Sequence, residues 1–335
     1  MPPVSVIVPA RDAEATLPRA LESVLAQDYA GGFEVIVADG SQRAGTARLV
    51  RRRFPGVRVV PNPGRGIACG LNAALRAARH PVIARCDARA MLPEWYLTRA
   101  VATLLRTGAA NVGGRVNPVG FSFFERAVAL ATSTPLGAGG ARYRIGGAQG
   151  PVDTVFPGVF RRDALDAAGG FDESLLRNED YELNWRLRAR GATVWFDPAL
   201  VVDYRPRGSF RALARQYFDY GRWKRVVLGR HPRSLKLRQA APPLLLAALA
   251  ASAALAVAGR LAGGAAPEVG ALLMGAAAVC PAGYGLLLTG ASAAIGLRRR
   301  CAAAVLLPVV AATIHLAWAA GFFAGAPGGA GLKRR

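Results

Sequence analysis

Short apolar runs alternate with amphipathic stretches along the N-terminal part of the chain. The apolar runs predict strands, at Val4–Ala10, 33–38, 57–62 and 81–88. The amphipathic stretches between them predict helices, at 16–27, 46–54 and 66–78. This order predicts an α/β fold in which a mostly parallel sheet is covered by helices on both faces.

Three longer apolar runs follow near the C-terminus. Residues 240–259 and 269–297 carry no charge, and residues 301–332 contain one basic side chain, His315. Each run reaches the roughly 20 residues that cross a bilayer as a helix. We therefore expect three transmembrane helices, kinked at Pro281 and Pro308.

The N-terminus shows no signal-peptide pattern, because its short apolar run meets Arg11 and Asp12 at once. We expect a multi-pass protein of the cytoplasmic membrane, with its catalytic domain in the cytoplasm. The expected division is an α/β domain at 1–205, a basic amphipathic segment at 206–239, and about three membrane helices with a short basic tail at 240–335.

Positive charge dominates, with a formal net charge of +22. Residues 205–238 hold eleven Lys/Arg and one acid, directly before the first apolar run. Binding to anionic lipid headgroups explains this basic block more directly than binding to nucleic acid does. Its position next to a membrane span indicates that the block lies on the cytoplasmic side of the membrane. With three spans the basic tail LKRR would lie outside. Either the third span is re-entrant or the second is a hairpin. The four cysteines lack the spacing of a zinc or disulfide framework.

The stretch RNEDYELNWRLRARG, residues 177–191, predicts a helix that begins after Asn178 and ends at Gly191. Helical spacing places Glu179 on an outward charged stripe and Asp180 on the inner side, beside Leu183. Asp180 is then either a helix cap or a semi-buried base. A first-turn position lowers the pKa of such a carboxyl, and burial raises it.

Three candidate ligand-binding residues stand at predicted strand ends: Pro9, Asp39 and Asp87. The carboxyl ends of parallel strands form the ligand crevice of such sheets, so the three are expected to converge. A strand-end aspartate can also simply cap a turn or the next helix, and for both acids this alternative stays open.

Taken in order, these stretches resemble the inverting family-2 glycosyltransferases with the GT-A fold. The resemblance covers about residues 4–225. It is carried by VSVIVPARDAEATLPRALESVLAQDY, EVIVADGSQRAGT, NPGRGIACGLNAALRAA, ARCDARA, GGFDESLLRNEDYELNWRLRARG and RQYFDYGRWKR. The last two blocks and the apolar spans are most similar to the membrane-bound, succinoglycan-type exopolysaccharide glucosyltransferases.

The resemblance implies roles for five residues. Asp39 corresponds to the aspartate that receives the nucleotide base, and Pro9 and Arg11 to the loop beside that base. Asp87 corresponds to the first acid of the Asp-x-Asp motif, near ribose and diphosphate. Asp180 corresponds to the base that deprotonates the acceptor hydroxyl.

The resemblance also implies acceptor and diphosphate contacts further along the chain. These are Gly170, Phe171, Asp172 and Glu179 around the acceptor pocket, and Gln216, Arg222 and Trp223 of a Q…RW motif. That motif is stretched here to Gln-x5-Arg-Trp, which favours addition of a single sugar over processive synthesis.

Arg89 stands where the second acid of Asp-x-Asp is usual. A divalent metal, Mg²⁺ or Mn²⁺, then keeps only Asp87 as a ligand. Arg89 is instead a donor-binding residue, a cation able to neutralise the diphosphate together with Arg222 and Lys224.

The implied function is transfer of a sugar from a nucleotide-sugar donor, UDP-hexose by resemblance, with inversion. The acceptor would be a lipid-linked saccharide at the cytoplasmic membrane face, for cell-surface polysaccharide synthesis. The amphipathic stretch 210–230 is expected at the bilayer surface, and packing against the catalytic domain is the alternative. A polyprenyl-phosphate sugar synthase and a non-catalytic nucleotide-binding membrane scaffold remain alternatives.

Overall fold

The computed structural model describes residues 1–325, which form two compact units. Unit 1 comprises Met1–Val119 and Ala141–Arg205, and unit 2 joins Gly120–Gly140 to the chain from Pro206 onward. One boundary between the two units falls between Arg205 and Pro206. Residues 120–140, which we placed in the α/β domain, instead group with the C-terminal helices.

Unit 1 is built on one mixed sheet. Its strands are β1 (Val4–Ala10), β2 (Phe33–Asp39), β3 (Arg58–Pro61), β4 (Val82–Arg85), β5 (Ala90–Met91), β6 (Asn111–Pro118), β7 (Gly150–Pro151), β8 (Gly158–Arg161) and β9 (Val194–Tyr204). Their order is β3-β2-β1-β4-β8-β6-β9-β5, with β7 paired to β9. The first four are parallel, as expected, while β8 runs antiparallel between β4 and β6.

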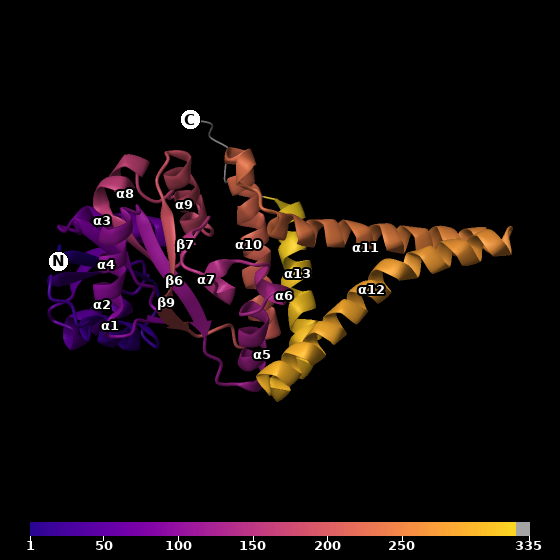
Figure 1. Ribbon diagram of the computed structural model, residues 1–335, viewed down its shortest axis with the longest axis horizontal. Helices are drawn as coiled ribbons and strands as arrows, with labels where there is room; N and C mark the ends of the chain where they lie inside the picture. Colours follow the sequence, from indigo (N-terminus) through magenta and orange to yellow (C-terminus); the bar gives the residue numbers. More distant parts are fainter. Residues whose placement is uncertain (326–335) are drawn as a thin grey trace. The chain divides into compact units, whose positions relative to one another are not determined.

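Helices cover both faces of this sheet (Figure 1). One face packs against α1 (Leu17–Leu25), α2 (Gly45–Arg53) and α4 (Tyr96–Thr107). The other packs against α3 (Ile67–Ala77), α8 (Arg162–Ala168) and α9 (Glu179–Ala189). Alternation along β1 sends Val6 and Val8 to the first core and Ile7 to the second. The expected three-layer α/β arrangement is therefore confirmed.

Helix α9 begins and ends where the sequence predicts, although the Asn178 side chain makes no capping hydrogen bond. The prediction of an outward charged stripe is wrong. Glu179 and Glu182 are both buried, because cations come to them: Arg85 contacts Glu179 and Arg186 contacts Glu182. Buried carboxylates are tolerated when they are paired in this way.

Unit 2 is helical. Its helices are α5 (Phe123–Thr132), α6 (Pro135–Ala138), α10 (Phe210–Arg230), α11 (Leu237–Ala262), α12 (Pro267–Arg299) and α13 (Leu307–Ala324). Three segments are long and apolar enough to cross a membrane: α11, α12, and residues 302–324, which contain α13. The third predicted run continues beyond the described residues, as does the tail LKRR.

Two expectations about these helices are decided by their bounds. Helix α12 continues through Pro281, so the second apolar run is one helix and not a hairpin. Pro308 does not kink a helix, since it lies in the first turn of α13, where proline needs no amide partner.

Candidate active site

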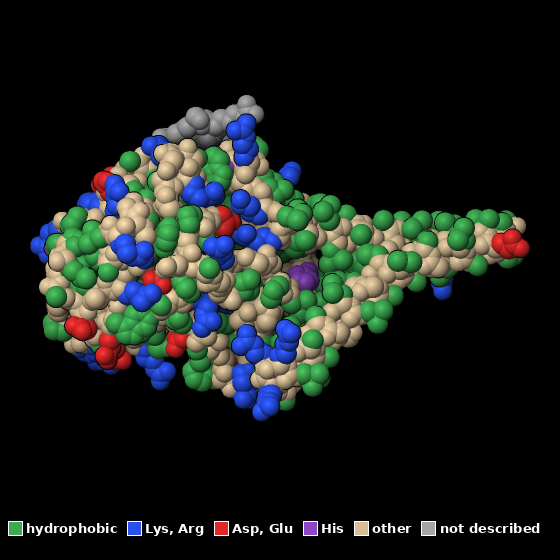
Figure 2. Space-filling model, in the orientation of Figure 1, with side chains coloured by type: hydrophobic (Ala, Val, Ile, Leu, Met, Phe, Trp, Pro, Cys, Tyr) green, Lys and Arg blue, Asp and Glu red, His purple; other side chains and the backbone are tan. Residues whose placement is uncertain are grey.

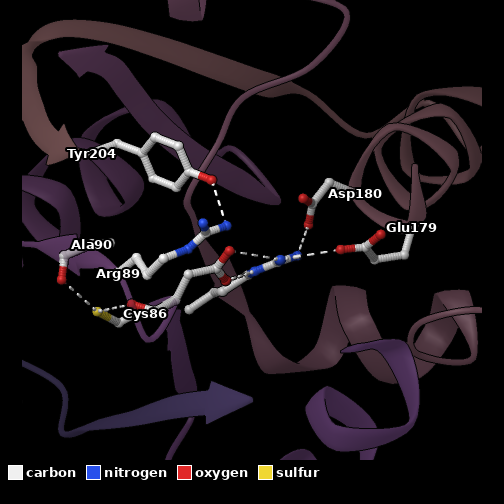
Figure 3. Close-up of polar contacts among 8 residues, drawn as sticks. Cys86, Arg89, Ala90, Glu179, Asp180 and Tyr204 are labelled. Atoms are coloured by element: carbon white, nitrogen blue, oxygen red, sulfur yellow. Dashed lines mark hydrogen bonds and ion pairs between the residues drawn. The ribbon is translucent and has the colours of Figure 1, made fainter. Parts of the chain in front are cut away.

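One buried arginine brings together three of the acids near the predicted site. The Arg85 guanidinium donates from Nε to Asp87 (2.8 Å) and from Nη2 to Glu179 (3.1 Å), and Nη1 donates to Asp180. Figure 3 shows Glu179 and Asp180 reaching from α9 toward this guanidinium. Residues almost a hundred positions apart in the sequence thus meet at one point.

Arg85 is held there by its place in the sheet. It is the last residue of β4 and pairs with Ile7 of β1, so its side chain starts from the core of unit 1. Only 1% of it is exposed. The Phe156 ring lies 5.1 Å from its guanidinium carbon and covers one face of the cation. Among the described residues, the contacts of the guanidinium are with the three carboxylates and this ring.

The charges of this cluster do not balance. One guanidinium against three ionised carboxylates leaves a net charge of −2 in a largely buried place. Burial raises the pKa of Asp180 to about 8; the attraction of Arg85 opposes the rise, and Glu179 and Asp87 add to it. The Asp180 side chain keeps 21% of its surface exposed. It can therefore exchange a proton with a bound molecule near neutral pH, as a general base must.

Arg89, the residue in the place of the second acid, is turned to a different partner. Its Nη2 donates to the Tyr204 hydroxyl at 2.7 Å, and its guanidinium carbon lies 5.2 Å from the Tyr204 ring centroid. Tyr204 is the last residue of β9, and Arg89 directly precedes β5. This hydrogen bond therefore links the end of β9 to the start of β5. It remains partly exposed, which leaves donors available to an anionic ligand.

Asp39, at the end of β2, is held by backbone amides and not by a cation. One carboxylate oxygen accepts from the Ser41 N–H (2.9 Å) and the other from the Ala47 N–H (3.0 Å) at the start of α2. The turn and capping alternative is thus present in the structure. Each oxygen still has a lone pair for a further donor.

The loop after β1 is tied to this same turn. The Asp12 N–H donates to Ser41 Oγ at 2.8 Å, and the Ala13 N–H donates to Thr46 Oγ1 at 3.1 Å. Pro9 is the second-last residue of β1 and pairs with Ala38, and Arg11 is exposed at the start of the loop. The loops that follow β1 and β2 are therefore joined by hydrogen bonds.

The predicted acceptor loop is fixed by a residue that the sequence did not single out. Asn72 of α3 donates to the Phe171 carbonyl oxygen (2.8 Å) and accepts from the Phe171 N–H (2.9 Å). Gly170 adopts φ +71°, a conformation that favours glycine, and a side chain there would strike Asn72. Phe171 itself is buried, and Asp172 accepts from Ser174 within a local turn.

The predicted Q…RW residues lie on α10, in unit 2. Gln216 donates to the Tyr220 hydroxyl (2.7 Å), and Arg222 donates to the Gly325 carbonyl oxygen (3.1 Å). Trp223 is buried. Lys224 is buried as well and donates to the carbonyl and hydroxyl oxygens of Ser234 (3.0 and 3.1 Å). In this structure Trp223 and Lys224 serve packing within unit 2, so Lys224 does not present its ammonium to a diphosphate.

Arg85 is the residue of this cluster that sequence reasoning missed. A signal was present, because an arginine closes an otherwise apolar strand, VIAR, that is expected to be buried. A buried cation needs carboxylate partners, and two acids that contact it were already candidates: Asp87 at a strand end and Asp180 on the predicted helix. Tyr204 and Asn72 carried no comparable signal.

The described residues contain no group of three or more His, Cys, Asp or Glu side chains placed to hold a metal ion. Asp87, the predicted ligand, has both oxygens within hydrogen-bonding distance of Arg85, at 2.8 and 3.4 Å. The protein side chains described here therefore do not form a metal site by themselves.

Comparison with known proteins gives this geometry a context. Residues 5–169 match the family described as "Glycosyl transferase family 2". The chain is 33% identical over 294 residues to the succinoglycan biosynthesis protein ExoA of Rhizobium meliloti, covering 86% of this chain and 84% of that protein.

A second relative is more distant. It is a dolichyl N-acetyl-α-D-glucosaminyl phosphate 3-β-D-2,3-diacetamido-2,3-dideoxy-β-D-glucuronosyltransferase of Methanococcus voltae. It is 22% identical over 237 residues, which cover 67% of this chain and 74% of that protein.

Among solved structures, the chain is similar to the mannosyltransferase PcManGT from Pyrobaculum calidifontis in complex with GDP-Man and Mn²⁺. The TM-score is 0.54 at 20% identity, covering 94% of this chain and 87% of that one. This likeness confirms the expected GT-A-like fold.

Proposed function

The chain belongs to glycosyl transferase family 2, and from that premise we propose that it transfers a hexose from a nucleotide sugar, with inversion, to a lipid-linked saccharide. The observation that carries this proposal is Asp180, a partly exposed carboxyl with a raised pKa, held beside Asp87 by one arginine. A site of this kind suits a one-base displacement better than nucleotide binding alone.

Asp180 is the base in this proposal. Inversion in one step needs a single carboxylate on the face of the sugar opposite the leaving group, where it takes the proton of the attacking hydroxyl. Arg85 fixes the orientation of the Asp180 carboxylate. Glu179, the residue before Asp180 in α9, pairs with the same guanidinium. Asp180 must be deprotonated to act, so the raised pKa sets the pH at which the enzyme becomes active.

The donor is placed at the strand ends. Asp39, joined through Ser41 to the loop that carries Arg11, is proposed to receive the nucleotide base, and Asp87 and Arg89 to lie beside the diphosphate. Calorimetry with UDP and GDP tests this placement. Asp39→Ala should weaken the preferred nucleotide about tenfold, the loss of one hydrogen bond from a charged group. Unchanged affinity would leave Asp39 as a cap of the turn and of α2.

A divalent metal stays a prediction for this chain. The neighbour from Pyrobaculum calidifontis holds Mn²⁺, whereas here the second acid is Arg89 and Asp87 is paired with Arg85. Transfer measured in excess EDTA decides between ions and arginine. Abolished transfer that Mn²⁺ or Mg²⁺ restores would assign the diphosphate to an ion held by Asp87 and the donor. Full activity in EDTA, lost in Arg89→Ala, would assign it to the arginine.

A lipid-linked acceptor is supported by two observations. The Methanococcus relative is named for a dolichyl-linked sugar phosphate, and the R. meliloti relative for succinoglycan biosynthesis. Unit 2 also provides three helices long and apolar enough to hold the chain in a membrane. We propose the cytoplasmic face of the membrane as the place of reaction, where nucleotide sugars are made and consumed.

The experiment that tests the function is a transfer assay in membranes that contain the full-length chain. Radiolabelled UDP- and GDP-hexoses are supplied in turn, and the lipid fraction is extracted and counted, with Asp180→Asn membranes as the blank. Label appearing only with polyprenyl-diphosphate saccharide supports the proposal. Label on bare polyprenyl phosphate would indicate a polyprenyl-phosphate sugar synthase. No turnover of any donor, hydrolysis included, would indicate a nucleotide-binding scaffold.

A further inference from the structure

Helices α11 and α12 form a hairpin whose surface is almost entirely apolar and exposed. Only 11% of the most apolar 18-residue stretch of each helix is buried within the chain. Near the turn the two helices touch through glycine: a Cβ at Gly259 would lie 3.0 Å from the Gly270 carbonyl oxygen. Hydrophobic side chains follow the length of this hairpin in Figure 2. A surface of this kind requires lipid around it.

Helix α13 is different, although its composition is equally apolar. Of its most apolar 18-residue stretch, 39% is buried within the chain, against α10 and α5, and α13 also contacts α11 and α12. The two helices run in the same direction in close contact (Figure 1). A Cβ at Gly221 would lie 1.9 Å from the Trp318 carbonyl oxygen, and one at Gly321 would lie 1.9 Å from that of Phe218.

Contacts extend along both helices at a constant offset. Leu213 shares a cluster with Val310, Gly221 meets Trp318, and the Arg225 guanidinium carbon lies 5.7 Å from the Phe322 ring centroid. Because the register is kept from one end to the other, α10 and α13 lie at the same depth in any membrane.

Helix α10 cannot lie in hydrocarbon. It carries six Lys/Arg and one acid over 21 residues, and Arg211, Arg215 and Arg225 are exposed along it. These arginines are spread over about 20 Å of helix, too far for all of them to reach one headgroup layer if the helix crossed the bilayer. A helix lying flat in the interface places all of them among headgroups.

The middle of α13 also contacts a segment that belongs outside hydrocarbon. The His315 Nε2–H donates to the Leu136 carbonyl oxygen at 2.7 Å, and in the neutral ring Nδ1 accepts from the hydroxyl of Tyr284 of α12 at 2.9 Å. Leu136 lies in the 120–140 segment, whose exposed Arg126 stands on α5, and the chain enters this segment from unit 1 and returns to unit 1 at Ala141. A crossing α13 would carry this segment into the bilayer.

We propose that only the α11–α12 hairpin crosses the membrane, and that α13 lies beside α10 in the interface with anionic lipid headgroups. The chain then crosses twice, and its C-terminus is on the same side as unit 1. This inference concerns the membrane and does not depend on the reaction catalysed.

The charge distribution agrees with two crossings. Arg298, Arg299 and Arg300, at the end of α12, fall on the side of α10. The turn at the far end holds one cation and one acid, Arg260 and Glu268. All strongly basic segments are thus on one side, and the conflict with the positive-inside rule that three spans create disappears.

Cysteine labelling of the full-length chain tests the proposal. Cys69, Cys280 and Cys301 are replaced, and Cys86, which is fully buried, is kept. Single cysteines are then placed at the turn (Ala265→Cys), after Arg335, and on exposed Ala189 of unit 1. Right-side-out vesicles are treated with a membrane-impermeant maleimide before and after detergent.

The proposal expects Ala265→Cys to be labelled in intact vesicles, and the C-terminal cysteine to be labelled only after detergent, like Ala189→Cys. A C-terminal cysteine labelled in intact vesicles as fully as Ala265→Cys would show that α13 crosses, and would overturn the proposal. An Ala265→Cys chain labelled only after detergent would overturn it too, because the hairpin would then not cross.

A matched pair of lysine variants gives an independent measurement. Leu286→Lys places a charge at the exposed middle of α12, and Thr313→Lys places one at the middle of α13. Interfacial α13 should tolerate lysine with membrane accumulation within about twofold of wild type, while Leu286→Lys loses about tenfold or more. Equal losses in the two variants would contradict the proposal.

Discussion

Arg85 in unit 1 is 1% exposed and lies among three carboxylates, whereas α10 in unit 2 carries six Lys/Arg for one acid and keeps Arg211, Arg215 and Arg225 exposed. In the first region a cation is buried and outnumbered by fixed negative charge. In the second, Arg211, Arg215 and Arg225 face solvent or headgroups, and the basic side chains outnumber the acid. Arginine is therefore expected to contribute very different free energies in these two regions of the chain.

Dielectric environment explains the difference. A buried pair is poorly screened and costly to break, so each change at the Arg85 cluster should have a large effect that salt does not alter. An exposed cation contributes little singly and is screened, so changes on α10 should be small, additive and salt-dependent. The predictions below test this contrast, from the largest effect to the smallest.

Asp180→Asn should reduce transfer by about two orders of magnitude or more, because the amide cannot take the acceptor proton. The amide oxygen can still accept from Arg85, so folding and donor affinity should stay close to wild type. Initial rates of transfer and calorimetric donor binding measure the two effects. Asp166→Asn, an exposed acid of α8 paired with Arg162, is the matched control. A variant that keeps half the wild-type rate would remove Asp180 as the base.

Arg85→Met should destabilise unit 1 by about 3–5 kcal/mol, since three carboxylates would lose the buried cation that they share. Arg161→Met, which breaks an exposed pair with Asp163, should cost less than about 1 kcal/mol. Thermal or denaturant unfolding compares them. Arg85→Lys keeps the charge but not the three-way geometry. It should fold and yet lose kcat more than donor affinity, and equal loss of both would assign Arg85 a structural role only.

The pH dependence of activity and stability should have opposite signs. The raised pKa of Asp180, about 8, means that transfer rises about tenfold per pH unit below it and levels off above it. A carboxyl whose pKa is higher in the folded state stabilises the fold at low pH, and that contribution is lost as pH rises from about 4 to 8. Wild type should thus lose melting temperature relative to Asp180→Asn across this window. Parallel curves for the two proteins would contradict the assignment.

The sequence predicted the fold of unit 1 well, because its signals are local. Short, nearly continuous apolar runs mark the strands, and amphipathic stretches between them mark the helices. The positions of Pro9, Asp39 and Asp87 near strand ends follow from that order. Helix α9 was placed within a residue or two by its first-turn acids and Gly191. The family resemblance then supplied the role of Asp180, which spacing alone left open between cap and base.

What the sequence did not predict depends on pairing between distant residues. Glu179 was assigned to an outward stripe because helical spacing cannot show that Arg85, on a strand ninety-four residues earlier, comes to meet it. Residues 120–140 were assigned to unit 1 because no composition change marks their return to the C-terminal helices. Hydropathy likewise gave α13 the same prediction as α11, since it counts apolar residues and does not register the neighbour that buries them.

The smallest effect is expected on α10. An arginine near an anionic surface contributes about 1 kcal/mol of attraction, so Arg211→Gln and Arg215→Gln should each reduce transfer in anionic vesicles by at most about fivefold. The loss should disappear in zwitterionic vesicles, and 0.5 M salt should reduce wild type to the level of the variants. Arg190→Gln, an exposed arginine of unit 1, is the control and should have no lipid-dependent effect. Because the Arg85 cluster is buried, the loss in Asp180→Asn should be the same at both salt concentrations. An α10 effect that persisted in high salt would mean that these arginines contact fixed protein groups, and the contrast between the two regions would then fail.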